Sequence, residues 1–323
     1  MKLLTTGKSS FFLAALLSVG IAFAQTGNEW KDPQVNAVNR LPMHATFFRY
    51  GDTESALAGN MKQSPYYLSL NGTWKFNGVQ NADQRPTDFY KTDYNDESWR
   101  TMPVPGIWEV NGFGDPLYVN ADYAWRGHAS YTPPLVPTEQ NRVGSYRRTI
   151  TIPADWKGKQ VIAHFGSVTS NIYLYVNSKF FGYSEDSKLD TEFDITNFLK
   201  PGDNLIAFQV FRWCDGTYLE CQDFWRLSGV ARDSYLYAVN PRHIEDINVT
   251  PDLDPDYNNG SLAIDVKMKA PASKVGVMLL DADGKVVFNK EILTNRTVNI
   301  PVVTPQKWTA ETPYLYTLLT TLK

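Results

Sequence analysis

The densest group of side chains that could carry out chemistry lies between Arg212 and Arg226. Flat aromatic faces pack against sugar rings, and carboxylates accept hydrogen bonds from sugar hydroxyl groups. The same residue types also form structural corners, in which arginine–carboxylate pairs lie beneath packed tryptophans. Both interpretations fit this segment, and strand spacing would place Trp213 and Asp215 on one face. The residues concerned are Arg212, Trp213, Asp215, Tyr218, Glu220, Asp223, Trp225 and Arg226.

Two pairs of acidic residues are candidates for the carboxylates of a glycosidase, Glu220 with Asp223 and Glu185 with Asp186. Glycosidases hold their two carboxyl groups roughly 5 to 9.5 Å apart. Neighbouring residues on a strand point to opposite faces, which argues against Glu185 with Asp186. We therefore expect neither pair to be catalytic. The sequence also contains no serine-hydrolase elbow, phosphate-binding loop or dinucleotide-binding fingerprint.

The cysteines and histidines do not follow a metal-binding pattern. Two cysteines exclude a disulfide-rich scaffold and a four-cysteine zinc site. In an oxidising compartment, the spacing of Cys214 and Cys221 fits either a disulfide or two buried thiols. The four histidines are His44, His128, His164 and His243. Their spacing is not that of metal ligands, so we expect isolated structural or surface residues.

Short strands must position these side chains, because alternating hydrophobic residues dominate from about Tyr67 to Val239. Residues 172–176 alternate between aliphatic side chains and tyrosines, which predicts a half-buried strand, and Asn177-Ser178 predicts the turn after it. Only residues 53–61 favour a short helix. Many short strands separated by turns predict a sandwich or jelly roll. Further strands are predicted at residues 146–152, 161–168, 180–183, 204–211 and 234–239.

A second β unit is predicted after Asn240-Pro241. In residues 262–269, large apolar side chains alternate strictly with small or charged ones, so one face of this strand is apolar and the other faces solvent. A hairpin loop at 281–284 and strands at 298–303 and 314–322 are also predicted. An immunoglobulin-like sandwich needs about seven strands in about 100 residues, so we expect this one to be incomplete.

The N-terminus has the features of a secretory signal peptide. Lys2 and Lys8 precede an uncharged apolar run, Phe11–Ala22, and the small-x-small pattern Ala22-Phe23-Ala24 predicts cleavage after Ala24. The run is shorter than the about 20 residues of a membrane span. We therefore predict an exported protein, periplasmic or extracellular.

Composition places the 323-residue chain among globular proteins, because 43% of its residues are hydrophobic. Its net charge of −3 and the absence of basic runs argue against a nucleic-acid partner. No other segment is long and apolar enough for a membrane span. The predicted fold is all-β, a jelly-roll β-sandwich followed by an incomplete immunoglobulin-like β-sandwich. The predicted divisions are a signal peptide at 1–24, an N-terminal arm at 25–65, the jelly roll at 66–240 and the immunoglobulin-like unit at 241–323.

Several motifs occur together in one order. The longest is Arg212-Trp-x-Asp-Gly-x-Tyr-Leu-Glu-x-Gln-Asp-x-Trp-Arg-x-Ser-Gly229. The others include Asn39-Arg-Leu41 with His44, Ser69-Leu-Asn-Gly-x-Trp74-x-Phe76, Val104-Pro-x-x-Trp108, Pro116-Leu-Tyr-x-Asn120, Gly182-Tyr-x-x-Asp-Ser187 and Trp308-x-Ala-Glu-x-Pro-x-Leu-Tyr316. From about residue 30 to the C-terminus, the chain resembles the N-terminal part of the large bacterial β-galactosidases of glycoside hydrolase family 2.

This resemblance implies a jelly-roll sugar-binding domain, an immunoglobulin-like domain, a catalytic (β/α)8 barrel and further β domains. The implied activity is hydrolysis of terminal β-galactosides with retention, in carbohydrate catabolism, by two glutamates of the barrel. A barrel needs about 250 residues, so we expect the catalytic glutamates to be absent and this chain alone to be inactive. A non-catalytic galactoside-binding module or a decayed remnant is the alternative.

The resemblance also assigns roles to two residues. Asp215 matches an aspartate that helps to hold a sodium ion and contacts the galactose 6-hydroxyl. Asn120 matches an asparagine on another loop of the galactose site. The family's magnesium ligands lie in the barrel, so none is expected here. The complete enzyme is expected to be a homo-oligomer.

Overall fold

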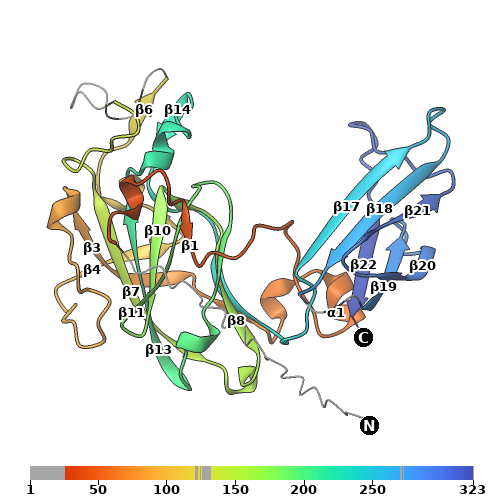
Figure 1. Cartoon of the computed structure of the whole chain (residues 1–323), viewed down its shortest axis with the longest axis horizontal. Helices are drawn as coiled ribbons and strands as arrows, with labels where there is room; N and C mark the ends of the chain where they lie inside the picture. Colours follow the sequence, from red (N-terminus) through yellow and green to blue (C-terminus); the bar gives the residue numbers. More distant parts are fainter. Residues whose placement is uncertain are drawn as a thin grey trace, which may run out of the picture.

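The computed structural model describes residues 26–120, 123, 125, 132–269, 271 and 273–322. The predicted signal peptide, residues 1–24, and His128 lie outside the described residues. Figure 1 shows two β-rich lobes, the larger ending near residue 239 and the smaller beginning near residue 246. The N-terminal segment, drawn in red and orange, runs along the larger lobe and then between the two lobes.

The larger lobe is a sandwich of two antiparallel sheets. The first contains β1 (Ala37–Val38), β3 (Gly72–Val79), β4 (Arg100–Val104), β7 (Val143–Ile152), β10 (Asn171–Val176), β11 (Lys179–Glu185) and β13 (Gly202–Phe211). Their order across the sheet is β1–β11–β10–β13–β7–β3–β4. The second contains β2 (Tyr67–Ser69), β8 (Gln160–Phe165), β12 (Thr191–Asp194) and β16 (Ser234–Val239), in the order β12–β8–β16–β2. Side chains from both sheets share one hydrophobic core, which is the jelly-roll arrangement that the sequence predicts.

Aromatic rings on β7 and its neighbours form the centre of this core. Tyr146 stacks on Phe208 with 4.3 Å between ring centroids, and the indole N–H of Trp108 donates to the Tyr146 hydroxyl at 2.5 Å. A Cβ atom on Gly144 would lie 2.5 Å from the Trp108 ring and 2.6 Å from the Phe76 ring. Glycine at position 144 therefore lets both rings pack directly on the β7 backbone.

The strands predicted between residues 146 and 239 are present, with ends that differ by a few residues. Asn177 and Ser178 form the turn between β10 and β11, with φ angles of 48° and 68°. Left-handed conformations at both central residues match the twist of a tight hairpin. The predicted turn at Asn177-Ser178 is thus confirmed.

The prediction that residues 172–176 form a half-buried strand is wrong, because all six residues of β10 are buried. The N-terminal segment covers the outer face of the sheet: the Trp30 backbone N–H donates to the Tyr173 hydroxyl at 3.0 Å. A loop from another part of the chain adds Tyr90, which stacks on Tyr175 with 4.3 Å between centroids. A second hydrophobic core therefore lies outside the sandwich, beneath these segments.

Helices are short and lie at the periphery. α1 (Thr53–Ala58) is capped by Asp52, whose carboxylate accepts from the Ser55 backbone N–H at 2.8 Å, and it ends at Gly59 with a φ of 66°. The helix predicted at 53–61 is confirmed in a shorter form. The 3-10 turns are η1 (Glu29–Lys31), η2 (Met61–Gln63), η3 (Ala82–Gln84), η4 (Glu109–Asn111), η5 (Ala154–Trp156), η6 (Thr196–Phe198) and η7 (Asp215–Tyr218). Within the described ranges, no helix has the length and apolar character needed to cross a bilayer.

The remaining strands of the larger lobe form two small sheets. One consists of β5 (Gly106–Ile107), β9 (Val168–Thr169) and β15 (Gly229–Val230). The other is a two-stranded ribbon of β6 (Leu117–Val119) and β14 (Phe224–Arg226). Figure 1 shows this ribbon at one end of the larger lobe, beyond the main sheets.

The smaller lobe is a second antiparallel sandwich. One sheet contains β17 (Asp246–Leu253), β18 (Gly260–Lys267) and β21 (Thr297–Val302). The other contains β19 (Lys274–Leu280), β20 (Val286–Leu293) and β22 (Thr317–Leu322). Ile264 and Val266 are buried between the sheets, as the alternation at residues 262–269 predicts, and Val277 of the other sheet packs in the same core. The chain is therefore nearly all-β, with a jelly roll followed by an immunoglobulin-like sandwich.

A buried carboxylate, Glu192, joins the N-terminal segment to the jelly roll. It accepts hydrogen bonds from His44 Nε2 at 3.1 Å, His164 Nδ1 at 2.9 Å and the Tyr237 hydroxyl at 2.9 Å. Burial alone would raise the pKa of Glu192, but the hydrogen bonds from His164 and His44 lower it to about 2. The bond to Glu192 raises the pKa of His44. These contacts explain two of the four histidines as structural residues.

Replacing Glu192 by Gln is expected to destabilise the protein more at pH 5.5 than at pH 8.5. A carboxyl with a lowered pKa stabilises the folded state above its ordinary pKa and loses this effect as the pH falls. A histidine with a raised pKa stabilises below about pH 6.5 and loses this effect as the pH rises. Both contributions are present near pH 5.5, where we expect a loss on the order of 2 kcal/mol in urea unfolding.

The matched control is Glu97→Gln, because the Glu97 side chain is exposed. This variant should unfold within about 0.5 kcal/mol of the wild type at both pH values. Equal destabilisation of Glu192→Gln at pH 5.5 and pH 8.5 would show that His44 carries no charge in the cluster.

Candidate functional site

The segment from Arg212 to Arg226 leaves the main sheet at its first residue, because β13 ends at Phe211. The Cys214 backbone N–H donates to the Thr217 hydroxyl at 3.1 Å, and the Thr217 N–H donates to the Cys214 carbonyl at 3.0 Å. These bonds close the 3-10 turn η7, which begins at Asp215. The expectation that strand spacing sets the positions of Trp213 and Asp215 is therefore wrong.

Arg212, the first residue of the segment, has a structural role. The Arg212 guanidinium is buried, lies 3.7 Å from the Glu109 carboxylate and packs over the Trp213 ring. It also donates to the backbone carbonyls of Asp115 at 3.0 Å and Arg226 at 3.4 Å. These contacts fit the interpretation as a structural corner, and they tie the base of the β6–β14 ribbon to the end of β13.

Two of the three carboxylates are also engaged locally. Glu220 accepts from the backbone N–H of Ser187 at 2.8 Å and from its hydroxyl at 2.5 Å. Asp223 accepts from the Tyr118 hydroxyl across the ribbon. Because both carboxylates hold neighbouring segments in place, the contacts of Glu220 and Asp223 explain them without a catalytic role.

Asp215 differs from Glu220 and Asp223, because one of its carboxylate oxygens has no hydrogen-bond partner among the described residues. This oxygen, Oδ1, is buried. The Glu185 carboxyl group lies beside Asp215, close enough for the two acidic groups to influence each other. Burial is the main cause that raises the pKa of both carboxyl groups. A ligand that supplies a positive charge or a hydroxyl hydrogen would satisfy this oxygen.

Glu185 reaches Asp215 because the turn has no side chain in between. A Cβ atom on Gly216 would lie 2.6 Å from Glu185 Oε2. The Tyr183 hydroxyl donates to Glu185 Oε1 at 2.5 Å, which fixes the carboxyl from the other side. In the sequence Glu185 is a candidate only as a pair with Asp186, whereas the fold places it beside Asp215. Thirty positions of sequence separate Glu185 from Asp215, and no local pattern links them.

Asn120 lies on the segment whose aromatic residues pack against η7, the turn that carries Asp215. It is exposed and directly follows β6. Farther along, Tyr123 and Trp125 pack edge-to-face on Tyr218 of η7, with centroids 4.6 and 4.7 Å apart. The aromatic contacts thus bring the segment that carries Asn120 against the turn that carries Asp215.

The cysteines do not form a disulfide in this structure. Cys214 is buried, with its Sγ 3.8 Å from the Ser170 carbonyl, and burial raises the pKa of its thiol well above the usual value. Cys221 is partly exposed and its Sγ lies 3.5 Å from the Arg226 guanidinium. The structure thus favours two thiols, and the Cys214 thiol has the environment of an unreactive buried cysteine.

The described residues contain no group of three or more His, Cys, Asp or Glu side chains arranged to hold a metal ion. Asp215 and Glu185 nevertheless fit one part of a cation site. They combine a buried oxygen that needs a partner with two adjacent acidic groups whose burial is unfavourable. A hard cation such as sodium prefers such oxygen ligands, and its other ligands would have to come from elsewhere.

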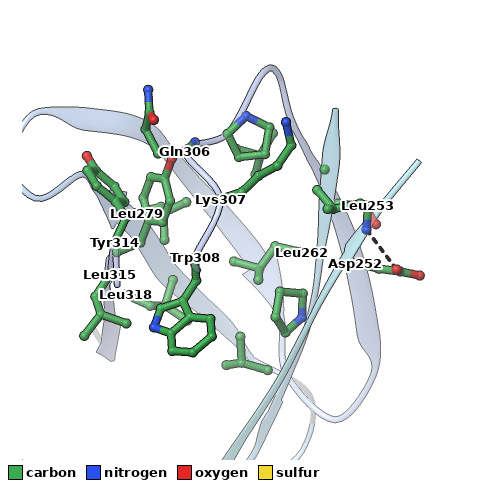
Figure 2. A pocket seen from close by; sticks show the side chains of 17 residues that line it. Asp252, Leu253, Leu262, Leu279, Gln306, Lys307, Trp308, Tyr314, Leu315 and Leu318 are labelled. Atoms are coloured by element: carbon green, nitrogen blue, oxygen red, sulfur yellow. Dashed lines mark hydrogen bonds between the residues drawn. The ribbon is translucent and has the colours of Figure 1, made fainter. Parts of the chain in front are cut away.

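Two cavities of the structure are lined by neither Asn120 nor Asp215. A cleft of about 1040 Å³ between the lobes is lined by the N-terminal segment together with His164, Asp190 and Glu192. An apolar groove of about 490 Å³ opens at one end of the smaller sandwich. Figure 2 shows Trp308 pointing into the space between Leu318 and Leu262 of this groove.

Comparison with known proteins gives a consistent result. Residues 67–240 match the glycosyl hydrolases family 2 sugar binding domain, and residues 242–323 match a second domain described as glycosyl hydrolases family 2. The chain is 40% identical to a beta-galactosidase of Priestia megaterium, over 91% of this chain and 30% of that protein. It is 38% identical to a beta-galactosidase of Halalkalibacterium halodurans, over 89% of this chain and 29% of that protein. The chain thus spans about 30% of the length of these curated relatives.

Solved structures show the same fold. A β-glucuronidase of Bifidobacterium dentium superposes with a TM-score of 0.61 and 19% identity, covering 79% of this chain and 44% of that one. A β-glycosidase of Bacteroides vulgatus gives a TM-score of 0.59 with 22% identity, covering 79% of this chain and 31% of that one. At such identities the likeness establishes the shared two-sandwich architecture.

Proposed function

The chain belongs to glycosyl hydrolases family 2, and from this membership we propose that it is the N-terminal part of an exported β-galactosidase. The enzyme removes terminal β-galactosyl groups with retention of configuration and serves carbohydrate catabolism. The observation that carries the proposal is the similarity to proteins named beta-galactosidase, at 38–40% identity over about 90% of this chain. Export rests on the signal-peptide pattern of residues 1–24.

In this proposal the chain contributes binding groups and no catalytic glutamate. Asp215 accepts a hydrogen bond from a galactose hydroxyl, which is supported by its buried oxygen without a protein partner. Asn120 presents an exposed amide, which both donates and accepts, on the segment that packs against η7. The nucleophile and the general acid of a retaining reaction are supplied by other parts of the enzyme.

A sodium ion held by Asp215 is part of the proposal. The ion would supply the positive charge that two adjacent carboxyl groups, Asp215 and Glu185, require when the site is closed to water. The magnesium ligands are proposed to lie outside this chain, and the complete enzyme is proposed to be a homo-oligomer.

The test is to purify the full-length protein and to follow hydrolysis of a β-galactoside by proton NMR. Appearance of the β-anomer of galactose before its mutarotation is the expected result, and α-galactose as the first product would refute retention. Hydrolysis of β-glucuronides in preference to β-galactosides would overturn the substrate. Binding of galactosides without hydrolysis would favour a non-catalytic binding module.

A further inference from the structure

Glu185 is a buried acidic residue at the end of a strand of the main sheet. It is the last residue of β11, and only 7% of its surface is exposed. Its backbone is fixed on two sides, since its N–H donates to the Asn36 carbonyl at 3.0 Å and its carbonyl accepts from the Arg40 guanidinium at 3.3 Å. Burial of an acidic group is costly unless its oxygens have partners, so a carboxyl group in this position needs an explanation.

The Glu185 carboxyl group is held by a neighbouring side chain and lies against the turn η7. The Tyr183 hydroxyl donates to Oε1 at 2.5 Å, and Tyr183 is itself fully buried, with its ring centroid 4.5 Å from that of Tyr173. The other oxygen, Oε2, lies 2.6 Å from the position that a Cβ atom on Gly216 would occupy. Glu185 therefore packs directly on the η7 backbone, one residue beyond Asp215.

Gly216 is required for this close approach and not for the conformation of the turn. Its φ angle lies outside the left-handed region, so an alanine could adopt the same backbone conformation. Of the atoms around a Cβ placed at this position, only Glu185 Oε2 is too close, because the next nearest, Cys214 Sγ, is 3.5 Å away. Glycine at position 216 therefore reserves space for the Glu185 carboxyl group.

The chain that follows Glu185 also holds the far side of the turn. Ser187 donates to the Glu220 carboxylate from its backbone N–H at 2.8 Å and from its hydroxyl at 2.5 Å. The contacts of Glu185 and Ser187 thus fix both ends of residues 215–220. Glu185 acts at the end that carries Asp215.

We propose that Glu185 is a positioning residue, which holds Asp215 in the orientation that its carboxylate needs to meet the galactose 6-hydroxyl. This inference rests on the proposed function, in which Asp215 contacts a galactose hydroxyl. The buried Oδ1 atom of Asp215 has no hydrogen-bond partner among the described residues, so no hydrogen bond of theirs fixes that oxygen. The adjacent Glu185 carboxyl group is anchored on the main sheet and supplies the rigid support. A small displacement of a group that orients a substrate lowers the rate by a large factor.

The experiment compares a nitrophenyl β-galactoside with its 6-deoxy analogue, the β-fucoside, on the full-length enzyme. The wild type should prefer the galactoside, because only this substrate offers a 6-hydroxyl to Asp215. In Glu185→Ala we expect the ratio of the two kcat/KM values to fall about tenfold, through the galactoside alone. Both substrates report on the same enzyme molecules, so this ratio does not depend on how much of a variant is folded.

Three further variants and one control complete the test. Glu185→Gln has the same length and an oxygen that can accept from Tyr183, so it should keep the ratio within about threefold of the wild type. Gly216→Ala places a methyl group where Oε2 lies and should lower the ratio as Glu185→Ala does. In the double variant the methyl group occupies the space that Glu185 leaves, so the ratio should fall no further. Glu97→Ala removes an exposed glutamate of the same lobe and should leave the ratio unchanged.

Other results would overturn the inference. If Glu185→Ala lowers kcat/KM equally for both substrates, Glu185 stabilises the lobe without orienting Asp215. Additive losses in the double variant would show that Gly216 does not act through Glu185. If Asp215→Asn abolishes the preference for the galactoside and Glu185→Ala retains it, the inference is wrong and the proposed function stands. If the wild type shows no preference, or hydrolyses neither substrate, the proposed contact of Asp215 fails first, and the inference fails with it.

Discussion

Replacing Asp215 by Asn in the complete enzyme is expected to lower kcat/KM for β-galactosides on the order of 100-fold. The substitution removes the negative charge and turns one acceptor oxygen into a donor NH2 group. The buried Oδ1 atom of Asp215 has no hydrogen-bond partner among the described residues, which is consistent with the proposed contact to a galactose hydroxyl or a sodium ion. A site built to pair with a substrate hydroxyl loses large factors when that pairing fails.

The measurement is steady-state kinetics on methyl β-galactoside at several sodium concentrations. The wild type should respond to sodium and Asp215→Asn should not, because the variant lacks a charged ligand. Asp115→Asn is the matched control: its side chain is 92% exposed at the same end of the lobe, so kcat/KM should remain within about twofold. Near-normal kinetics of Asp215→Asn would remove this residue from the galactose site.

The strands of both sandwiches could be predicted from the sequence because the alternation of side chains that defines a strand extends over only a few consecutive residues. Alternation at residues 172–176 and 262–269 reports which side chains can share a face. The extra burial of β10 could not be predicted in this way. It depends on Trp30, which lies 143 positions before Tyr173 along the chain, and periodicity does not report such a distant cover.

In the candidate site, too, local features could be predicted from the sequence and contacts between distant segments could not. Asp215 and Asn120 could be assigned from the sequence because each lies within a short, local motif. Glu185 beside Asp215, and Tyr118 beside Trp225, are tertiary neighbours from segments far apart in sequence. The strand expectation at Asp215 failed because the Thr217 side chain closes a local turn, a hydrogen-bonding option that competes with extended backbone.

Replacing Trp108 by Ala is expected to destabilise the jelly roll by about 3 to 5 kcal/mol, the usual cost of truncating a large buried ring. Trp108 is fully buried and packs on Phe76 and Phe113 with centroids 6.0 and 5.3 Å away. Its loss also removes the hydrogen bond that it donates to the buried Tyr146 hydroxyl. The cavity cannot close easily, because Gly144 lacks a side chain that could fill it.

Urea unfolding, monitored by circular dichroism, measures the effect, with Trp225→Ala as the matched control. Both variants lose the same side chain, but Trp225 is half exposed on the ribbon and should cost less than about 0.5 kcal/mol. The comparison separates two tryptophan environments of the lobe, since Trp108 is fully buried and Trp225 is half exposed. Similar losses of stability in the two variants would contradict this prediction, because truncating a half-exposed ring should leave no buried cavity.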